Sequence, residues 1–530
     1  MKMGSIGLLP AHYCLSVSGR KWTLNFKNRN AEKKWNVQLT AGAAANLGTI
    51  GSGMTLGFSA VALPAMQTSY HEPAVSDEEA SWVASLTSIG MPVGCLFMGP
   101  LMDRLGRKRT LMLVNLPAVL GWLLLASASH SPSWFLWQVY AGRLLTGLTT
   151  GLVNTPAVVY ASETMEKMWR GVVVTWPSIG VSLGVLIVYV LGAIFRDNWR
   201  LVAGISTIIP VVSIVVVWYV LPETPVWLVS RGKNEEAELS IRRIRSVPPE
   251  QSLPDNLQEE LDAMISSRTQ QTSESSWKDT LAFLKRPEAY KPLLIFNAFF
   301  FFQQFSGIFV IIFYAVSIIR ESRVNFDGYL ATVLIGVCRL VVSVIISFAS
   351  RRYGRRLLCN ISGVGLTLTT GCLALFLSLN HGGIIDAKAL ATYTWIPVSA
   401  LLLSVLLGTV GFLTLPFAMI GEVYPLKIRG SACGFTTFMA TIFVFVAVKL
   451  YPEMKHLMGL HNVFVFYTAV ACAGTVTMYF CLPETQGKTL EEIEEYFRSG
   501  GKSAMDKEKA ASSKLLQVTV QEKSSLEEER

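Results

Sequence analysis

Two adjacent amides, Gln303 and Gln304, lie near the middle of an apolar run over residues 297–319. A run of this length can cross the hydrocarbon core of a bilayer as a helix, and a polar group at that depth needs a partner or an aqueous cavity. Each amide offers donors and an acceptor. The residues alone leave two interpretations open: the amides bond to a neighbouring helix, or at least one of them faces a polar solute.

Arg339 is a second polar residue at membrane depth, near the middle of the apolar run 328–350. No Asp or Glu lies in the middle of any apolar run, so this guanidinium has no intramembrane acid to pair with. A charge in that position is costly and is typical of a functional site. Either Arg339 is a counter-charge for an anionic or strongly polar substrate, or it reaches cavity water or helix-end carbonyls.

Acidic and basic residues recur together at the ends of apolar runs. Glu163 precedes Arg170-Gly171 by seven residues, and Glu422 precedes Arg429-Gly430 by the same step. Carboxylates and guanidiniums at facing helix ends can form bidentate pairs. Two further boxes are repeated between the halves of the chain, DRLGRK at 103–108 with RRYGRR at 351–356, and PET at 222–224 with PET at 483–485. The repeats predict two structurally equivalent halves.

Helices must position these residues, because apolar runs of spanning length recur along the whole chain. The chain has 530 residues, of which 51% are hydrophobic and 16% are charged, whereas a soluble protein carries about 25% charged residues. We predict an all-α polytopic membrane protein with twelve transmembrane helices in two six-helix bundles. The apolar runs cover 41–64, 80–101, 109–128, 133–161, 171–195 and 199–221, and then 292–319, 328–350, 357–379, 393–421, 431–451 and 461–482.

The runs divide the chain into five parts. We expect an N-terminal tail over 1–38, a first bundle over 39–221, a helical linker over 222–291, a second bundle over 292–482 and a partly disordered tail over 483–530. Short amphipathic helices are expected in the linker over 234–246 and 257–266.

Loop charge predicts the orientation. The loop 65–80 holds four acids and no Lys or Arg, whereas the loops 103–109 and 351–356 are rich in arginine. An excess of Lys and Arg marks the cytoplasmic side, so we expect both tails and the linker inside the cell. The net charge of +9 arises largely from such loops and indicates no nucleic-acid partner.

Small residues pattern the first half. Four GxxxG motifs lie in separate apolar runs, at 53–57, 90–94, 147–151 and 180–184. Glycine at this spacing lets helix backbones approach closely. The motifs predict a tightly packed bundle.

The ordered set of motifs resembles the sugar porter family of the major facilitator superfamily, and within it most nearly the insect facilitated trehalose transporter branch. The resemblance spans 99–494 and implies the major facilitator fold with short cytoplasmic helices. It rests on GPLMDRLGRK at 99–108, GR at 142–143, PETPVWL at 222–228, QQFSGI at 303–308, GRR at 354–356, GEVYPLKIRG at 421–430 and PETQGKTLEEIE at 483–494.

The resemblance implies a cytoplasmic gate made of ion pairs that break when the transporter opens inward. It implies that Glu163 meets Arg355 and Arg356, and that Glu422 meets Arg107 and Lys108. One departure is Arg351, where the family usually has an acid. The network implied for this chain comprises Asp103, Arg104, Arg107, Arg143, Glu163, Arg170, Arg355, Arg356, Glu422 and Arg429.

The resemblance also implies a midplane sugar site, with Gln303 and Gln304 at the position of the family's amide pair. Other contact positions differ from the family pattern, which reduces the number of neutral hydrogen-bonding partners available to a polyol. The departures are Phe309 and Arg339 where Asn is usual, Ser178 where Gln is usual and Phe417 where Trp is usual.

The function implied is facilitative (uniport) transport of a sugar, trehalose or a hexose, across the plasma membrane by alternating access. The first apolar run lacks the acid that proton-coupled relatives carry, so proton symport is not expected. One alternative is a transporter of the same fold that moves an organic anion by means of Arg339. Another is a non-transporting receptor. No nucleophile–base or metal-ligand spacing is present, so neither enzyme activity nor a cofactor is expected.

Overall fold

The computed structural model describes residues 29–68, 75–129, 132–166, 172–248, 252–270, 283, 285–322, 326–350, 352–383, 393, 395–425, 428–486, 488 and 490–498. Within these ranges the regular structure is helical throughout. The predicted disordered tail beyond 498 lies outside the described residues, as do Arg170 and Arg351.

The first half consists of long helices, two of which are interrupted. The third is broken at 114–115 between α3 and α4, and the last at Thr207 between α8 and α9. The helices are α1 (Arg29–Thr68), α2 (Asp77–Leu105), α3 (Arg107–Leu113), α4 (Leu116–Ala126), α5 (Pro132–Thr164), α7 (Trp176–Ile194), α8 (Trp199–Ser206) and α9 (Ile208–Val220).

The second half also consists of long helices, but its breaks lie at other positions, at 306–307 and at 411–414. Its first helix is broken at Ser306 and Gly307, and Gly307 has a φ of 82°, which glycine adopts without the strain of a side chain. The helices are α14 (Pro287–Phe305), α15 (Ile308–Glu321), α16 (Gly328–Ala349), α17 (Arg355–His381), α19 (Trp395–Val410), α20 (Leu415–Val423) and α21 (Arg429–Cys481).

The spanning segments can be counted from these helices. Among the described residues, ten segments are long and apolar enough to cross a membrane. One of them, α21, has 53 residues and turns at Gly459, where φ is 78° and ψ is 156°, so it supplies two spans. The 33-residue α5 is also long enough to cross. Together these give the twelve helices that the sequence predicts.

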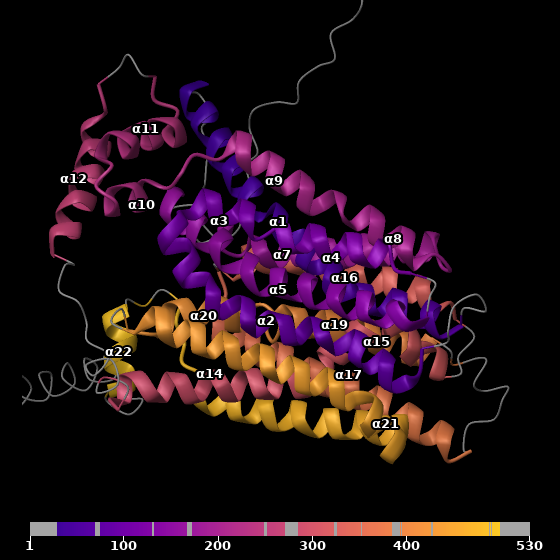
Figure 1. Ribbon diagram of the computed structural model, residues 1–530. Helices are drawn as coiled ribbons and strands as arrows, with labels where there is room; N and C mark the ends of the chain where they lie inside the picture. Colours follow the sequence, from indigo (N-terminus) through magenta and orange to yellow (C-terminus); the bar gives the residue numbers. More distant parts are fainter. Residues whose placement is uncertain are drawn as a thin grey trace, which may run out of the picture.

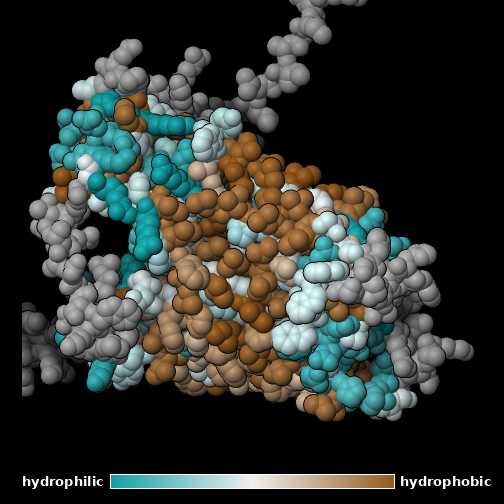
Figure 2. Space-filling view, viewed as in Figure 1, coloured by the Kyte–Doolittle hydropathy of each residue, from teal (hydrophilic) through white to brown (hydrophobic). Residues whose placement is uncertain are grey.

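The two halves lie side by side along most of their length (Figure 1). The linker helices α10 (Pro225–Ser230), α11 (Asn234–Arg245) and α12 (Asp255–Gln270) gather beyond one end of the first half, and α22 (Leu490–Arg498) lies at the same end of the second. Figure 2 shows a broad hydrophobic belt between two hydrophilic ends. Such a belt suits the hydrocarbon core of a bilayer.

The two linker helices predicted from the sequence are present with different bounds. Ser246, which has a left-handed φ of 55°, ends α11 one residue earlier than predicted, and α12 extends beyond the predicted 257–266 in both directions. The apolar faces of α11 and α12 pack together through buried residues that include Ile241 and Leu261.

The glycine motifs bring helix backbones into contact, as predicted. A Cβ atom on Gly147 or Gly151 would collide with backbone carbonyl oxygens of α2, and one on Gly53 or Gly184 would collide with carbonyl oxygens across the α1–α7 contact. Close approach of this kind strengthens van der Waals packing in a bilayer. The motifs therefore fix the pairs α2–α5 and α1–α7.

Candidate functional site

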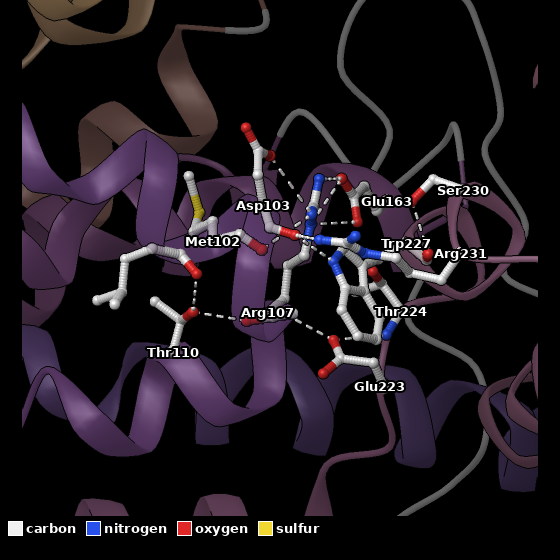
Figure 3. A network of polar contacts seen from close by, with 12 residues as sticks. Met102, Asp103, Arg107, Thr110, Glu163, Glu223, Thr224, Trp227, Ser230 and Arg231 are labelled. Carbon is white, nitrogen blue, oxygen red and sulfur yellow. Dashed lines mark hydrogen bonds and ion pairs between the residues drawn. The ribbon is translucent and has the colours of Figure 1, made fainter.

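The first ionic cluster lies at the end of the first half that carries α10–α12. The guanidinium of Arg107 binds the carboxylate of Glu163, with Nη2 2.8 Å from Oε1 and Nε 3.1 Å from both oxygens. Both side chains are largely buried, at 14% and 13% exposure. Asp103 is 4.0 Å from Arg107 and 78% exposed. The strong contact in this cluster is thus the bidentate Arg107–Glu163 pair (Figure 3).

Glu223, from the PET box, caps the start of α3. Its carboxylate accepts hydrogen bonds from the backbone N–H groups of Arg107, at 2.7 Å, and Lys108, at 3.0 Å. A negative charge is favoured at this end of a helix. Burial nevertheless raises the pKa of Glu223, although the backbone N–H donors and Arg107 act in the opposite direction. Gly106 precedes the helix with a φ of 87°, and a Cβ there would collide with the Glu223 carboxylate.

The second half builds the same cluster from its own residues. Arg355 binds Glu422 through both terminal nitrogens, with Nη2 2.6 Å from Oε1. Glu484, from the second PET box, accepts from the backbone N–H groups of Arg355, at 3.0 Å, and Arg356, at 3.2 Å. Gly354 lies against Glu484 as Gly106 lies against Glu223. The repeat in the sequence is therefore a structural repeat.

The implied pairing of these residues across the two halves is not what the structure shows. Glu163 binds Arg107 rather than Arg355 or Arg356, and Glu422 binds Arg355 rather than Arg107 or Lys108. The reason is geometric, because each glutamate ends a helix that lies beside the arginine turn of its own half.

The two remaining basic residues of that implied pairing contact other groups. Lys108 lies over the ring of Trp218, with its Nζ 5.9 Å from the centroid. Arg356 donates to the carbonyl oxygen of Tyr479. Neither contact crosses between the halves.

Three other residues of the implied network form no ion pair with Glu163 or Glu422 among the described contacts. Arg143 is fully buried within α5 and donates to Val83 O, at 3.0 Å, Thr55 O, at 3.1 Å, and the Ser59 hydroxyl. It thereby ties α5 to α1 and α2, away from the ionic cluster. Arg429 donates to the carbonyl oxygen of Tyr424 at 3.2 Å, and Arg104 is exposed at the end of α2.

The amide pair lies at the end of α14, directly before the helix break. Both side chains are fully buried. Gln303 donates to the carbonyl oxygen of Phe412, in the turn between α19 and α20, and Gln304 donates to Gln303 Oε1 at 2.8 Å. Within the part of the chain that the structure describes, the Oε1 atom of Gln304 has no hydrogen-bond partner. Gln303 thus joins two helices, while Gln304 keeps a free acceptor.

Arg339 is 6% exposed on the face of α16 that packs against α7 of the other half. On the same face, Ser343 shares a 2.7 Å hydrogen bond with Ser182, and Gly336 lies against the backbone of Leu186. The Nε and Nη1 atoms of Arg339 have no hydrogen-bond partner among the described residues. An unpaired guanidinium at this depth is costly, so the site holds an unused cationic donor.

The three remaining predicted contact residues lie on three helices. Phe309 is buried in α15, and Ser178 is half-buried in the first turn of α7. Phe417 is 43% exposed on α20, and its ring centroid is 4.8 Å from that of Phe300. These positions do not test whether the three residues bind substrate, so that role stays a prediction.

A group of buried tyrosines in the second half was not predicted from the sequence. Tyr314, Tyr451 and Tyr467 are buried, and none of their hydroxyls bonds to another described residue. The rings of Tyr314 and Tyr451 lie 4.8 Å apart. A signal was present, because a phenol inside an apolar run normally seeks a partner for its hydroxyl.

Comparisons with known proteins agree with this architecture. Residues 41–497 match a family described as "Sugar (and other) transporter". The chain is 31% identical over 458 residues to the facilitated trehalose transporter Tret1 of Polypedilum vanderplanki, covering 86% of this chain and 87% of that protein. It is also 31% identical to Tret1 of Drosophila grimshawi, but spans only 47% of that longer protein.

Solved structures show the same fold. The proton:xylose symporter XylE bound to 6-bromo-6-deoxy-D-glucose superposes with a TM-score of 0.70 at 19% identity, covering 88% of this chain and 100% of that one. The inward open form of XylE from E. coli gives 0.69 at 19% identity, over 86% of this chain and 99% of that one. The chain therefore belongs to the sugar (and other) transporter family and has the major facilitator fold.

Proposed function

We propose that the protein is a facilitative transporter that carries a sugar, trehalose or a hexose, across the membrane by alternating access. It is an integral multi-pass membrane transporter and not an enzyme. The family match and the similarity to proteins named facilitated trehalose transporters support the choice of solute. The observation that carries the proposal is the Gln303–Gln304 pair beside the break between α14 and α15, because broken helices at midplane are typical of transporter binding sites.

Uniport follows from the charges within the spans. No described span has an Asp or Glu near its middle, and proton coupling through a membrane protein normally needs such a group. The two buried intramembrane cations, Arg143 and Arg339, have no carboxylate among their hydrogen-bond partners. Solute gradients alone would then drive the flux.

Alternating access is supported by an asymmetry between the two ends. At the end away from the linker helices, Arg196 of the first half pairs with Asp327 of the second, and Lys449 lies 4.1 Å over the Trp82 ring. At the linker end, the described ion pairs of Glu163 and Glu422 stay within one half, while the hydroxyls of Thr175 and Ser347 share a hydrogen bond across the halves. This pattern suits a state that is held closed by charged contacts at the first end and by a weaker, uncharged contact at the second, which can then open.

The orientation and location are part of the proposal. The arginine-rich turns, including 104–109, lie at the end that carries α10–α12 and α22, and basic loops favour the cytoplasmic side. We place both tails and the linker over 222–291 in the cytoplasm. The linker joins the bundle over 39–221 to the bundle over 292–482. The plasma membrane is the expected location.

Uptake by the purified full-length protein in liposomes tests the proposal. Radiolabelled trehalose and glucose should enter in a saturable way, and an imposed pH gradient should leave the initial rate unchanged. Liposomes without protein are the control. Folded protein that binds either sugar but gives no flux would identify a receptor, and a rate that follows the pH gradient would identify a symporter.

A further inference from the structure

Among the described residues of the spanning helices, two arginines are buried and only one of them is fully hydrogen-bonded. Arg143 donates to Val83 O, Thr55 O and the Ser59 hydroxyl, so each of its three nitrogens has an acceptor. Arg339 is buried to a similar degree, but its Nε and Nη1 atoms have no acceptor. The comparison shows that this fold can neutralise the cost of a buried guanidinium with backbone carbonyls. At Arg339, no described backbone carbonyl accepts from the Nε or Nη1 atom.

The surroundings of Arg339 do not explain its charge. No carboxylate of the described residues forms an ion pair with it. The polar groups on the same helix face are already paired, because Ser343 bonds Ser182 and Ser347 bonds Thr175. The hydroxyl of Tyr189, on the facing helix, donates to the carbonyl oxygen of Ile312. No described group accepts a hydrogen bond from the Nε or Nη1 atom of Arg339, so a bound solute can supply that acceptor.

A planar guanidinium with adjacent free N–H groups is suited to bidentate binding of a carboxylate. A neutral hydroxyl would fill one of these donors but would leave the charge uncompensated. Gln304 contributes a second unpaired group of the opposite kind, an acceptor that suits a hydroxyl. Together, these free groups match a solute that carries both an anionic group and hydroxyls.

We propose that Arg339 binds a carboxylate on the transported solute, and that the preferred substrate is a sugar acid rather than a neutral sugar. The inference rests on the proposed function, because it takes for granted that the solute passes between α16 and the rest of the site. Arg339 then selects for a negatively charged solute. Gln304 provides the contact to a hydroxyl.

D-Glucose and D-glucuronate form a matched pair for the test, because they differ only in carrying CH2OH or a carboxylate at C6. Wild-type protein in liposomes should take up glucuronate about tenfold or more faster than glucose at low concentration. Arg339→Gln should reverse this preference, and Arg339→Lys should keep part of it. Arg320→Gln, which removes an exposed cation at the end of α15, is the matched control and should leave the ratio unchanged.

The charge of the solute gives an independent readout. Uniport of glucuronate moves a net negative charge, so a membrane potential that is positive inside the liposome should accelerate its uptake and leave glucose uptake unchanged. If Arg339→Gln does not fold, Arg339→Lys and the potential dependence of the wild type decide the question.

The possible outcomes separate this inference from the proposed function. Wild-type protein that transports glucose or trehalose but not glucuronate would overturn the inference and leave sugar transport intact. An unchanged solute ratio in folded Arg339→Gln would also overturn it. Folded wild-type protein that transports none of these solutes would remove both.

Discussion

Arg107 and Glu163 form a bidentate ion pair within the first half, and its counterpart in the second half is made by equivalent residues. The Nη2 atom of Arg107 is 2.8 Å from Glu163 Oε1, and the Nη2 atom of Arg355 is 2.6 Å from Glu422 Oε1. Each pair fastens a helix end to the arginine turn beside it. Because neither pair joins the halves, both can persist while the halves rock against each other.

Neutralising either glutamate should therefore affect the rigidity of one half. Removing one partner of a buried, charge-assisted hydrogen bond costs about 1–3 kcal/mol, and the cost should be smaller at Glu422, whose side chain is 42% exposed. We expect Glu163→Gln and Glu422→Gln each to lower the melting temperature in detergent and to reduce the maximal rate of uptake, with little change in KM. Asp103→Asn is the control, since Asp103 is exposed and 4.0 Å from Arg107. Equal losses in all three variants would contradict this role.

The glycines that precede the two arginine turns should differ in their sensitivity. A Cβ at Gly106 or Gly354 would collide with the carboxylate of Glu223 or Glu484, respectively, but only Gly106 has a positive φ, of 87°. With a ψ of 171°, Gly106 has a backbone conformation that is essentially confined to glycine and costs a residue with a side chain about 1–3 kcal/mol. Gly106→Ala should therefore lower the melting temperature more than Gly354→Ala. Gly99→Ala, where a Cβ meets nothing within 4 Å, should be neutral or slightly stabilising.

A covalent cross-link between the two halves, at the end away from the linker helices, should lock the transporter in one state. Arg196 and Asp327 are paired there, although both side chains are partly exposed and the pair itself contributes little to stability. Cysteines at both positions, joined by a short bifunctional reagent, should abolish uptake, and cleavage of the linker should restore it. Uptake that continues after complete cross-linking would show that this end does not open during transport. Each single cysteine, treated alike, is the control.

The buried carboxyl group of Glu223 should make stability depend on pH. Burial raises its pKa above the ordinary 4.5 in the folded protein, so the folded state binds a proton more tightly than the unfolded chain does. Stability is then lost as pH rises from about 4.5 through the raised pKa. We expect the melting temperature to fall over that range in the wild type and to fall less in Glu223→Gln. Parallel curves for the two proteins would refute the assignment.

The sequence predicted more about the architecture than about the contacts. The repeated boxes predicted that Arg107 and Arg355 occupy equivalent positions in the two halves, and that Glu163 and Glu422 do so too. Two structurally equivalent halves should have the same residues at equivalent helix ends. The motifs do not say which arginine each glutamate reaches, since both halves offer a guanidinium and the conformation decides between them. Arg143 has the same limitation: its position in a motif suggests a charged partner, whereas the fold supplies two carbonyl oxygens and a hydroxyl.

The three tyrosines with unpaired hydroxyls provide a last test of the second half. A buried hydroxyl without a partner costs about 1–3 kcal/mol, so Tyr451→Phe and Tyr467→Phe should raise the melting temperature of protein free of solute. Tyr189→Phe is the matched control: it should lower the melting temperature, because the Tyr189 hydroxyl donates to Ile312 O at 2.8 Å and the substitution removes this hydrogen bond. The solute gives the second readout. If these phenylalanine variants instead weaken sugar binding while the protein stays folded, the free hydroxyls of Tyr451 and Tyr467 are contacts for the solute, and their cost in the empty protein is offset when the solute binds.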